Sequence, residues 1–450
     1  MATSRRRFLA QALAPAVAVA AARSTKPNFL VIVSDDQGMG DLGCYGASDV
    51  KTPNLDRLAA SGVRFTNWHA NSPVCSPSRA SLITGRYPHR TGIPQILFSK
   101  PGFDVPGLKA GEATLATELR KLGYRTGAIG KWHLGSTPES RPLAQGFDEF
   151  FGYYSGWIDY YSHRFYTLGG QPVYHDLWRG EKEVWRDNEY MTEVLGREAR
   201  AFLRRQNREK PFFLYLTFGA PHYPMMAPQR YVDRFPETMD RDRRMHAAMI
   251  SALDDAIGGV MAELKSRGVL ENTVVFFMSD NGATEEERAD HRGRRYQGGS
   301  NGPLRGSKGS LFEGGIRVPA MMSWPGKIRA GQVREECGIA MDILPTFLEW
   351  AGGKAPAHVD GVSVAAPLTQ DSAWPADRDL FWSYDGQTAI RRGNWKLVEQ
   401  PRERLGGEVT AGPWLSDLAR DPGEKQNLAT EPGTPSADLR RALTAWRAGI

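Results

Sequence analysis

The stretch "NFLVIVSDD" (residues 28–36) decides the fold of this 450-residue chain. Five consecutive apolar residues follow Asn28, so side chains on both faces of this segment would be buried. That pattern is typical of a central strand in a parallel sheet covered by helices on both sides. The run then changes abruptly into Ser34, Asp35 and Asp36. In open α/β sheets ligands gather beyond the carboxyl ends of the strands, so these carboxylates mark a candidate site.

Three further β-rich runs end in polar clusters. The run "RTGAI" (residues 125–129) leads into Lys131 and His133, "FFLYLTF" (212–218) into His222, and "TVVFFM" (273–278) into Asp280 and Asn281. Helical patterns lie between them, the longest over residues 242–268. This alternation predicts an α/β fold, with a large mostly parallel β-sheet sandwiched by helices. We expect the four polar clusters to meet at one edge of that sheet.

The pattern changes beyond about Pro375. The segments "DLFWSY" (residues 379–384) and "QTAIRRGNWKLVEQ" (387–400) have turn residues between them, and a helical stretch covers residues 436–448. They predict a small C-terminal antiparallel sheet packed by one helix. We therefore divide the chain into an export signal (1–22), a large α/β domain that carries the candidate site (23–375) and a small α+β subdomain (376–450).

The first residues have the features of an export signal. A basic triplet, Arg5 to Arg7, precedes a run rich in Ala and Val, and small residues at 20–22 offer a cleavage point. The segment "SRRRFL" (residues 4–9) resembles the bacterial twin-arginine signal. Since the apolar part is too short to span a bilayer, we expect a periplasmic or secreted protein with no stable membrane anchor after cleavage.

Charge and composition argue against a nucleic-acid partner. The formal net charge is +6, and removing the three arginines of the signal leaves about +3. The remaining basic residues are scattered among acidic ones rather than gathered in one basic tract. No nucleic-acid partner is therefore predicted.

The acidic clusters predict a metal site. Asp35, Asp36, Asp280 and Asn281 offer three carboxylates and an amide, all of them hard oxygen ligands. Oxygen-only ligands favour Ca²⁺, with Mg²⁺ or Mn²⁺ second, and no Cys/His spacing indicates zinc. The pair Asp254 and Asp255 in the long helical pattern is instead interpreted as part of a solvated face.

Cys75 is one of three cysteines, and it stands where a helix is predicted to begin. Ser76 is a suitable N-cap, Pro77 suits the first helical position and Gly85 can end the helix. Arg79, one turn further on, can reach back, so this place favours an anion. A buried structural cysteine and a thiolate nucleophile both remain open at this point. Cys44 and Cys337 could form at most one disulfide, and the sequence leaves that pairing open.

The neighbours of Cys75 carry a resemblance to a known family. The residues "CSPSR" (75–79) match the C-x-P-x-R signature of type I sulfatases, within "SPVCSPSRASLITGRYPHRTG". The blocks "VIVSDDQG", "IGKWHLG", "APHYP", "MSDNGA" and "LRGSKGSLFEGGIRVP" follow in the order of that family. On these motifs the chain resembles a formylglycine-dependent sulfatase of the alkaline phosphatase superfamily, similar to arylsulfatases and N-acetylgalactosamine sulfatases.

This resemblance implies a mechanism and a set of roles. In the family the motif cysteine, here Cys75, is oxidised by a formylglycine-generating enzyme to Cα-formylglycine, whose hydrate is the nucleophile that attacks sulfur. The implied calcium ligands are Asp35, Asp36, Asp280, Asn281 and modified Cys75. Arg79 and Lys131 would hold the nucleophilic oxygen, and His133 would accept a proton during sulfate release. His222 and Lys308 would bind sulfate, with His222 protonating the leaving alcohol.

An aromatic segment between the second and third clusters indicates the substrate. It reads "FFGYYSGWIDYYSHRFY" (residues 150–166), and its "DYYSH" resembles the arylsulfatase B-like enzymes. Aromatic rings stack on sugar faces and Arg binds carboxylate or sulfate. The substrate-binding residues expected here are Tyr160, His163 and Arg164. We therefore expect a sulfated carbohydrate substrate, with an aryl sulfate also accepted. The segment could also be plain core or a dimer face.

Two other functions remain open at this stage. Related enzymes with similar metal and formylglycine sites hydrolyse phosphonate monoesters or phosphodiesters, and a non-catalytic glycan-binding relative would keep the fold without the reaction. The intact set of site residues favours the sulfatase over both.

Overall fold

The computed structural model describes residues 24–99, 102–166, 173–207, 209–285, 297–375 and 378–449. The predicted export signal, residues 1–22, lies outside this part. Within it, no helix has both the length and the apolar composition needed to cross a membrane.

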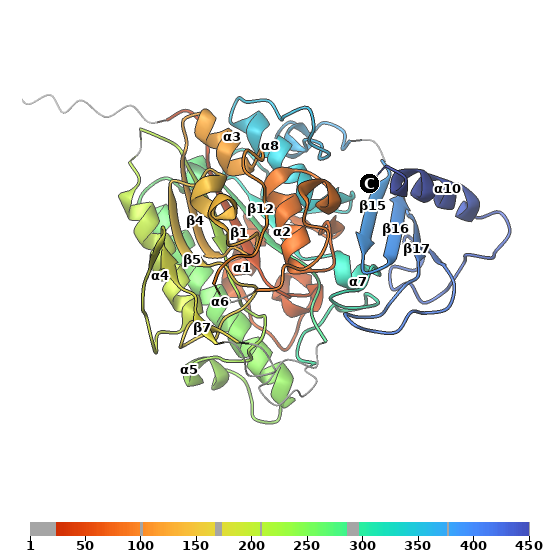
Figure 1. The fold of residues 1–450 in the computed structure, drawn as a ribbon, viewed down its shortest axis with the longest axis horizontal. Coiled ribbons are helices and arrows are strands. Elements are labelled where there is room, and N and C mark those ends of the chain that lie inside the picture. Colours follow the sequence, from red (N-terminus) through yellow and green to blue (C-terminus); the bar gives the residue numbers. More distant parts are fainter. Residues whose placement is uncertain are drawn as a thin grey trace, which may run out of the picture.

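The four predicted strands form the centre of one sheet. They are β1 (Asn28–Ser34), β4 (Arg125–Lys131), β10 (Phe212–Thr217) and β11 (Thr273–Ser279). They lie side by side in the order β11-β1-β10-β4, and all three pairings are parallel. Parallel pairing brings their carboxyl ends to one edge. The predicted fold class is confirmed (Figure 1).

Six further strands extend this sheet to ten, in the order β13-β2-β12-β11-β1-β10-β4-β5-β8-β9. They are β2 (Val63–Phe65), β5 (Glu149–Tyr153), β8 (Trp178–Arg179), β9 (Lys182–Glu183), β12 (Ala320–Ser323) and β13 (Gln332–Arg334). Strand β12 runs antiparallel to β11, and β5 runs parallel to β4. The sheet is therefore mixed at its margins and parallel where the candidate residues lie.

Helices cover both faces of this sheet, as the apolar runs predict. Phe29, Val31 and Val33 belong to one core, with helices α2 (Cys75–Thr84), α3 (Leu115–Lys121) and α8 (Ile343–Trp350). Leu30 and Ile32 belong to the other, with α1 (Pro53–Ala60), α4 (Met191–Arg205) and α6 (Arg241–Ser266). Successive residues of β1 thus point to opposite faces, and both faces are buried.

Asp254 corrects one expectation. It lies in α6 but is buried, and its carboxylate accepts hydrogen bonds from the backbone N–H groups of Asn54 and Leu55 at the start of α1. A negative charge there satisfies free N–H groups of α1 and complements the helix dipole. The prediction of a solvated pair holds only for Asp255, which lies in an exposed ion pair with Arg234.

The C-terminal part forms the predicted antiparallel sheet and helix. The strands are β15 (Leu380–Tyr384), β16 (Gln387–Arg392), β17 (Trp395–Glu399) and β18 (Trp414–Asp417), in that order, and α10 (Ser436–Arg447) packs on them. They lie at one end of the molecule, in blue in Figure 1. The remaining short elements are β3 (Trp68–His69), β6 (Arg164–Phe165), β7 (Tyr174–His175), β14 (Gly338–Ile339), α5 (Gln229–Val232), α7 (Glu313–Ile316) and α9 (Ala365–Thr369).

The C-terminal part also supports the loop that carries Lys308. The backbone N–H of Ser307 donates to the Glu403 carbonyl at 2.9 Å, and that of Leu405 donates to the Lys308 carbonyl at 2.7 Å. Lys396 of β17 is fully buried and lies 2.9 Å from Glu313 and 3.2 Å from Glu424. The loop between β17 and β18 therefore helps to hold a candidate catalytic residue.

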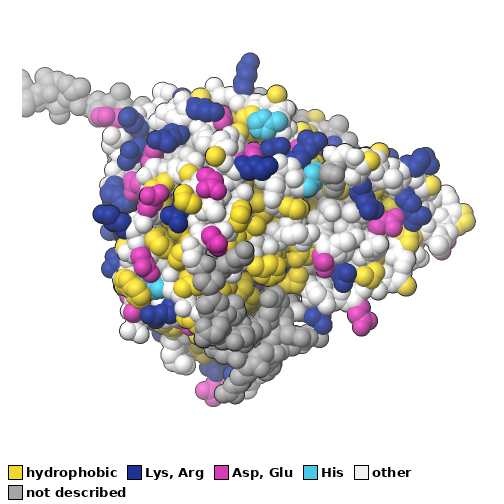
Figure 2. Space-filling view, viewed as in Figure 1, with side chains coloured by type: hydrophobic (Ala, Val, Ile, Leu, Met, Phe, Trp, Pro, Cys, Tyr) yellow, Lys and Arg dark blue, Asp and Glu magenta, His cyan; other side chains and the backbone are white. Residues whose placement is uncertain are grey.

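The cysteines are not crosslinked, and charges of both signs are mixed on the surface. All three thiols are free, so Cys44 and Cys337 do not form a disulfide in this structure. Figure 2 shows basic and acidic side chains interspersed over the face seen in that view. Stability therefore depends on the two hydrophobic cores rather than on a crosslink.

Candidate active site

The polar clusters meet at the carboxyl ends of the central strands. Ser34 pairs with Ser279 at the ends of β1 and β11, so Asp35 and Asp280 emerge side by side. The Asp280 N–H donates to the Ser34 carbonyl at 3.1 Å, and the Asp36 N–H donates to Asp280 Oδ1 at 3.3 Å. Asp36 has a φ of 61°, a left-handed conformation that is uncommon for a residue other than glycine. This turn directs the carboxylates of Asp35 and Asp36 into the site.

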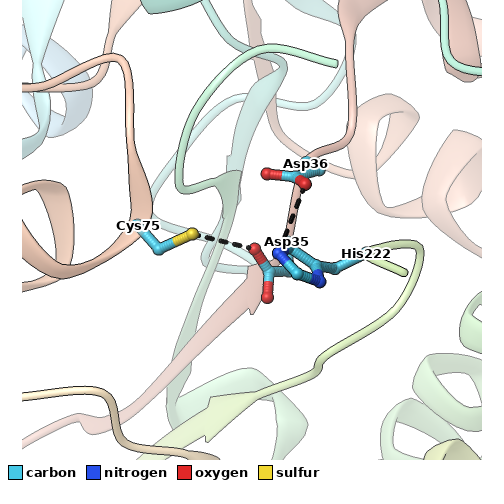
Figure 3. A group of neighbouring side chains, drawn as sticks. All are labelled: Asp35, Asp36, Cys75 and His222. Carbon is cyan, nitrogen blue, oxygen red and sulfur yellow. Dashed lines mark hydrogen bonds and ion pairs between the residues drawn. The ribbon is translucent and has the colours of Figure 1, made fainter. Parts of the chain in front are cut away.

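Helix α2 brings Cys75 to this group. Its Sγ lies 3.5 Å from Asp35 Oδ1, as Figure 3 shows. The helix begins at Cys75, two residues earlier than predicted, and its N-cap is Val74 rather than Ser76. The Ser76 hydroxyl instead accepts a hydrogen bond from the Leu97 N–H. Gly85 ends the helix with a φ of 68°, as predicted. Burial, and next Asp35, raise the pKa of the Cys75 thiol, which opposes its use as a thiolate nucleophile.

Arg79 lies one turn along α2 and is buried. Its Nε and Nη2 each lie 2.8 Å from Asp280 Oδ2, and its Nη1 donates to the Lys131 carbonyl at 3.1 Å. Asp35 lies 3.8 Å from Nη2. The guanidinium therefore ties three strand ends, those of β1, β4 and β11, to the helix that carries Cys75.

Two buried lysines neutralise the remaining carboxylates. Lys131 Nζ forms a short ion pair with Asp35 Oδ2, and Lys308 Nζ lies 2.9 Å from Asp36 Oδ2. With Arg79 and Asp280, the site holds three buried cations and three buried carboxylates whose formal charges cancel. Buried charges persist only when they are paired and hydrogen-bonded, as they are here.

His133 faces the site with one ring nitrogen unoccupied. Its Nε2 lies 2.8 Å from the Leu97 carbonyl, which can only accept, so Nε2 carries the proton. Nδ1 is buried without a hydrogen-bond partner and is the basic nitrogen of the ring. Burial, and next Lys131, hold the pKa of His133 well below its usual value, so the ring is neutral.

His222 is oriented by its own neighbour. Its Nδ1 donates to the Tyr223 carbonyl at 2.7 Å, and its Nε2 points towards Asp36 Oδ2 at 3.6 Å (Figure 3). Burial, and then Lys308 and Lys131, hold the pKa of His222 well below its usual value. The structure thus leaves Nε2 as the ring atom directed at the site.

The donor set fits a divalent cation. The amide Nδ2 of Asn281 donates to Asp36 Oδ1 at 2.7 Å and to the Gly282 carbonyl at 2.9 Å. This leaves Asn281 Oδ1 buried without a partner, and a cation would satisfy it. Ligand atoms of Asp35, Asp36, Cys75 and His222 also lie within 4.8 Å of one another. The residues are therefore able to hold a hard cation such as Ca²⁺.

The three predicted substrate-binding residues lie in different settings. Tyr160 is buried, and its hydroxyl donates to the His222 carbonyl at 2.9 Å. His163 is fully buried, and its Nε2 donates to the Glu189 carbonyl at 3.0 Å. Arg164 is half-buried, with its guanidinium 5.5 Å from the centre of the Trp185 ring.

Two further residues contact the histidines and were not singled out from the sequence. The Trp157 ring lies 6.2 Å from the His222 ring and nearly parallel to it, at 20°. A Cβ added at Gly156 would lie 2.7 Å from Cε1 of His133, so this glycine allows the ring its position. Both residues lie in the aromatic segment, residues 150–166, and that position is the sequence feature that could have indicated them.

Comparison with known proteins assigns the family. The Sulfatase family model matches residues 27–353, which covers both sheet margins and every candidate residue. The chain belongs to the sulfatase family. A second model, N-sulphoglucosamine sulphohydrolase, C-terminal, matches residues 307–447 of this sulfatase.

Relatives align with the sulfatase over most of its length. Human N-acetylgalactosamine-6-sulfatase is 35% identical over 93% of this chain and 84% of its own. Human arylsulfatase A is 35% identical over 97% of this chain and 89% of its own. The crystal structure of Ps i-CgsB in complex with k-i-k-neocarrahexaose superposes with a TM-score of 0.83, at 32% identity, covering 94% of this chain and 93% of that one.

These comparisons confirm the resemblance drawn from the motifs. The sulfatase is an enzyme of the sulfuric ester hydrolase class. The non-catalytic alternative loses its support, because most of the chain aligns with named sulfatases and the candidate residues converge. The structure of a phosphonate monoester hydrolase of Agrobacterium radiobacter shares the fold, with a TM-score of 0.65 at 22% identity.

Proposed function

We propose that this chain is an exported sulfatase that hydrolyses sulfate monoesters of sulfated carbohydrates, with Ca²⁺ and a Cα-formylglycine formed from Cys75. The observation that carries the proposal is the position of Cys75, buried at the start of α2 and 3.5 Å from Asp35 at the meeting point of the strand ends. The proposed calcium ligands are Asp35, Asp36, Asp280, Asn281 and modified Cys75. When bound, the cation would stabilise negative charge, and the hydrated aldehyde would supply the hydroxyl that attacks sulfur.

The charges of the site support an anionic substrate. The three buried cations and three buried carboxylates cancel, so a divalent cation raises the formal charge to about +2. A sulfate monoester brings one negative charge, which this excess would attract. Arg79 and Lys131 are proposed to hold the nucleophilic oxygen, and Lys308 to hold sulfate oxygens. Each acts as a preorganised donor that does not need to move as charge develops.

His133 is proposed as the base that accepts a proton on Nδ1 during sulfate release. Because the pKa of His133 lies well below 6.5, Nδ1 stays unprotonated at neutral pH and gains a proton only as the pH falls through the lowered pKa. We expect kcat to keep its plateau below pH 6.5 and to fall only at more acidic pH. A profile of kcat from about pH 4 to 9 at saturating substrate tests this. An acidic limb centred at or above pH 6.5 would contradict it.

His222 is proposed as the acid that protonates the leaving oxygen. Since Nδ1 is held by the Tyr223 carbonyl, the transferred proton would be carried on Nε2. A bound sulfate ester opposes the effect of Lys308 and Lys131 and so favours that proton. If His222 is the acid, its removal should slow the reaction more for a poor leaving group than for a good one.

We expect His222→Ala to lower kcat/KM for a sugar sulfate by about 10²–10⁴, because an alkoxide is a poor leaving group without a proton. With 4-nitrophenyl sulfate, whose phenolate leaves without help, the loss should be about tenfold or less. The exposed His358→Ala serves as the matched control and should leave both substrates unaffected. Equal losses on both substrates would rule out the acid role.

The relatives support a sulfated carbohydrate as the substrate. They include N-acetylgalactosamine-6-sulfatases, and the related crystal structure was solved with a neocarrahexaose. The aromatic segment lies beside His222, through Trp157 and Tyr160. Of the three predicted substrate-binding residues, Arg164 is the one whose side chain reaches solvent, and we propose that it contacts the sugar. Tyr160 would act indirectly, by holding the His222 loop.

Export and maturation complete the proposal. The leader, residues 1–22, would direct export through the twin-arginine route to the periplasm or beyond, and a formylglycine-generating enzyme would act on the motif at Cys75. The proposed division into residues 23–375 and 376–450 follows the change from the large sheet to the small one.

The decisive experiment is mass spectrometry of the peptide that contains Cys75, prepared from active protein of the native host. Conversion to the aldehyde removes H₂S and adds O, and that mass change is the expected result. Active protein in which Cys75 is wholly unmodified would overturn the mechanism. A side-by-side measurement of kcat/KM on an aryl sulfate and a phosphodiester separates the sulfatase from a phosphodiester hydrolase, and a strong preference for the phosphodiester would reject our proposal.

A further inference from the structure

A second group of ligating side chains lies away from the proposed calcium site. His163, His175 and Asp187 place one ligand atom each within 4.8 Å of the others. His163 directly precedes β6, His175 lies on β7, and these two strands pair antiparallel. Asp187 lies on the loop before α4, where the Asn188 N–H donates to the Tyr161 carbonyl at 2.9 Å. Three separate segments therefore converge at one point.

Both histidines present an unoccupied ring nitrogen. His163 Nε2 donates to the Glu189 carbonyl at 3.0 Å, which leaves Nδ1 without its proton, and Nδ1 is buried with no hydrogen-bond partner. His175 Nδ1 lies 2.8 Å from Glu183 Oε1 and donates to it, which leaves Nε2 buried and without a partner. His163 is 0% exposed and His175 7%. Two buried ring nitrogens without partners at one place can both be satisfied by a single bound ion.

The contacts behind the rings are those of metal-ligating histidines. A ligating imidazole commonly donates its other N–H to a carboxylate or a backbone carbonyl, which sets the tautomer and the ring orientation. Glu183 and the Glu189 carbonyl supply these two acceptors here. The His175 ring is further held by Trp185, whose ring is stacked on it at 3.8 Å.

We propose that His163 Nδ1, His175 Nε2 and the Asp187 carboxylate bind a Zn²⁺ ion. Two imidazole nitrogens with one carboxylate suit zinc, whereas Ca²⁺ and Mg²⁺ prefer oxygen ligands. In tetrahedral zinc sites neighbouring ligand atoms lie about 3.4 Å apart, so small side-chain rotations from the present separations would close the site. Because Asp187 is exposed, the fourth position faces solvent and would take a water molecule.

The charges and packing of this site are consistent with a zinc ion. The carboxylates of Asp187 and Glu183 would balance the two charges of the ion, and both imidazoles would bind in their neutral form. The ion would clamp the β6–β7 hairpin to the loop before α4. That hairpin packs on the active-site wall, because Phe165 lies 4.8 Å from Trp157 between ring centres. The bound ion would therefore stabilise the side of the active site next to His222.

Zinc titration of the chelator-treated full chain tests the proposal. Zn²⁺ is added with saturating Ca²⁺ present, and binding is measured by competition with a chromophoric chelator. Wild type should bind one equivalent more than His163→Ala or His175→Ala, and Co²⁺ in its place should give visible absorption bands only in wild type. Zinc that enters the calcium site is common to all variants and cancels in this comparison.

Three additional variants make the test specific. Asp187→Asn changes an exposed side chain, so it keeps the test valid if a histidine variant fails to fold, and it should weaken zinc binding at least about tenfold. Glu183→Gln removes the carboxylate behind His175 and should weaken binding about 10–100-fold. The exposed His358→Ala should bind zinc as wild type does. Equal zinc stoichiometry and affinity in wild type, His175→Ala and Asp187→Asn would overturn the proposal.

Discussion

Replacing Cys75 with alanine is expected to lower kcat on sulfate esters by a factor on the order of 10⁶, which is the scale seen when an enzyme loses its nucleophile. Alanine cannot be oxidised to an aldehyde, so no hydrate forms and nothing replaces the attacking hydroxyl. The cavity left by one sulfur is small, and the ion pairs of Arg79 and Lys131 do not involve Cys75. The measurement is kcat on 4-nitrophenyl sulfate with protein matured in the native host.

Cys44→Ala is the matched control, since it removes a free, half-buried thiol elsewhere in the chain. This variant should keep its activity within a few fold of wild type. Melting temperatures of both variants near that of wild type would show that the fold is intact. Residual activity of Cys75→Ala above about one per cent of wild type would mean that Cys75 is not the source of the nucleophile.

The second large effect is expected for Asp280→Ala, and it concerns stability as well as activity. Asp280 accepts a hydrogen bond from Arg79 Nε and forms an ion pair with Nη2, and both side chains are buried. Removing one partner of a buried ion pair leaves the other charge uncompensated, at a cost of about 3–5 kcal/mol in the free energy of unfolding. The proposed cation site also loses a carboxylate, so more Ca²⁺ should be needed for any remaining activity.

Thermal melting with and without Ca²⁺ measures both consequences. We expect a lower melting temperature for Asp280→Ala and a smaller rise on adding Ca²⁺ than in wild type. Asp255→Ala is the control, because its ion pair with Arg234 is about 40% exposed on both sides and should contribute about 0–1 kcal/mol. Equal loss of stability in the two variants would contradict the structural role of the Arg79–Asp280 pair.

Much of the fold follows from local sequence patterns. The run after Asn28 is apolar at every position, and that is why it predicts a strand buried on both faces, with Val31 and Ile32 in different cores. The mixed margins of the sheet were not predicted. Strands β8 and β9 have two residues each, too few to show a period, and their pairing depends on neighbours distant in the sequence.

The residues proposed as metal ligands and nucleophile were also predicted from the sequence, because each follows a strand or begins a helix. Their proton positions were not. The basic nitrogen of His133 is Nδ1 only because the Leu97 carbonyl, 36 residues away, occupies Nε2. The burial of Asp254 was not predicted either. The sequence pattern assigns this residue to a solvated face, whereas in the structure its carboxylate lies against the start of α1.

The sequence alone determined the four central strands and the long helices between them, the residues at the ends of those strands and the sulfatase motif around Cys75. These depend on periodicity and on neighbours along the chain, which a sequence displays directly. Only the tertiary structure decided which carboxylate pairs with Arg79, which ring nitrogens are unoccupied, and that His163, His175 and Asp187 meet. Those outcomes depend on contacts between distant segments, where burial removes water and each polar atom must find its partner within the protein.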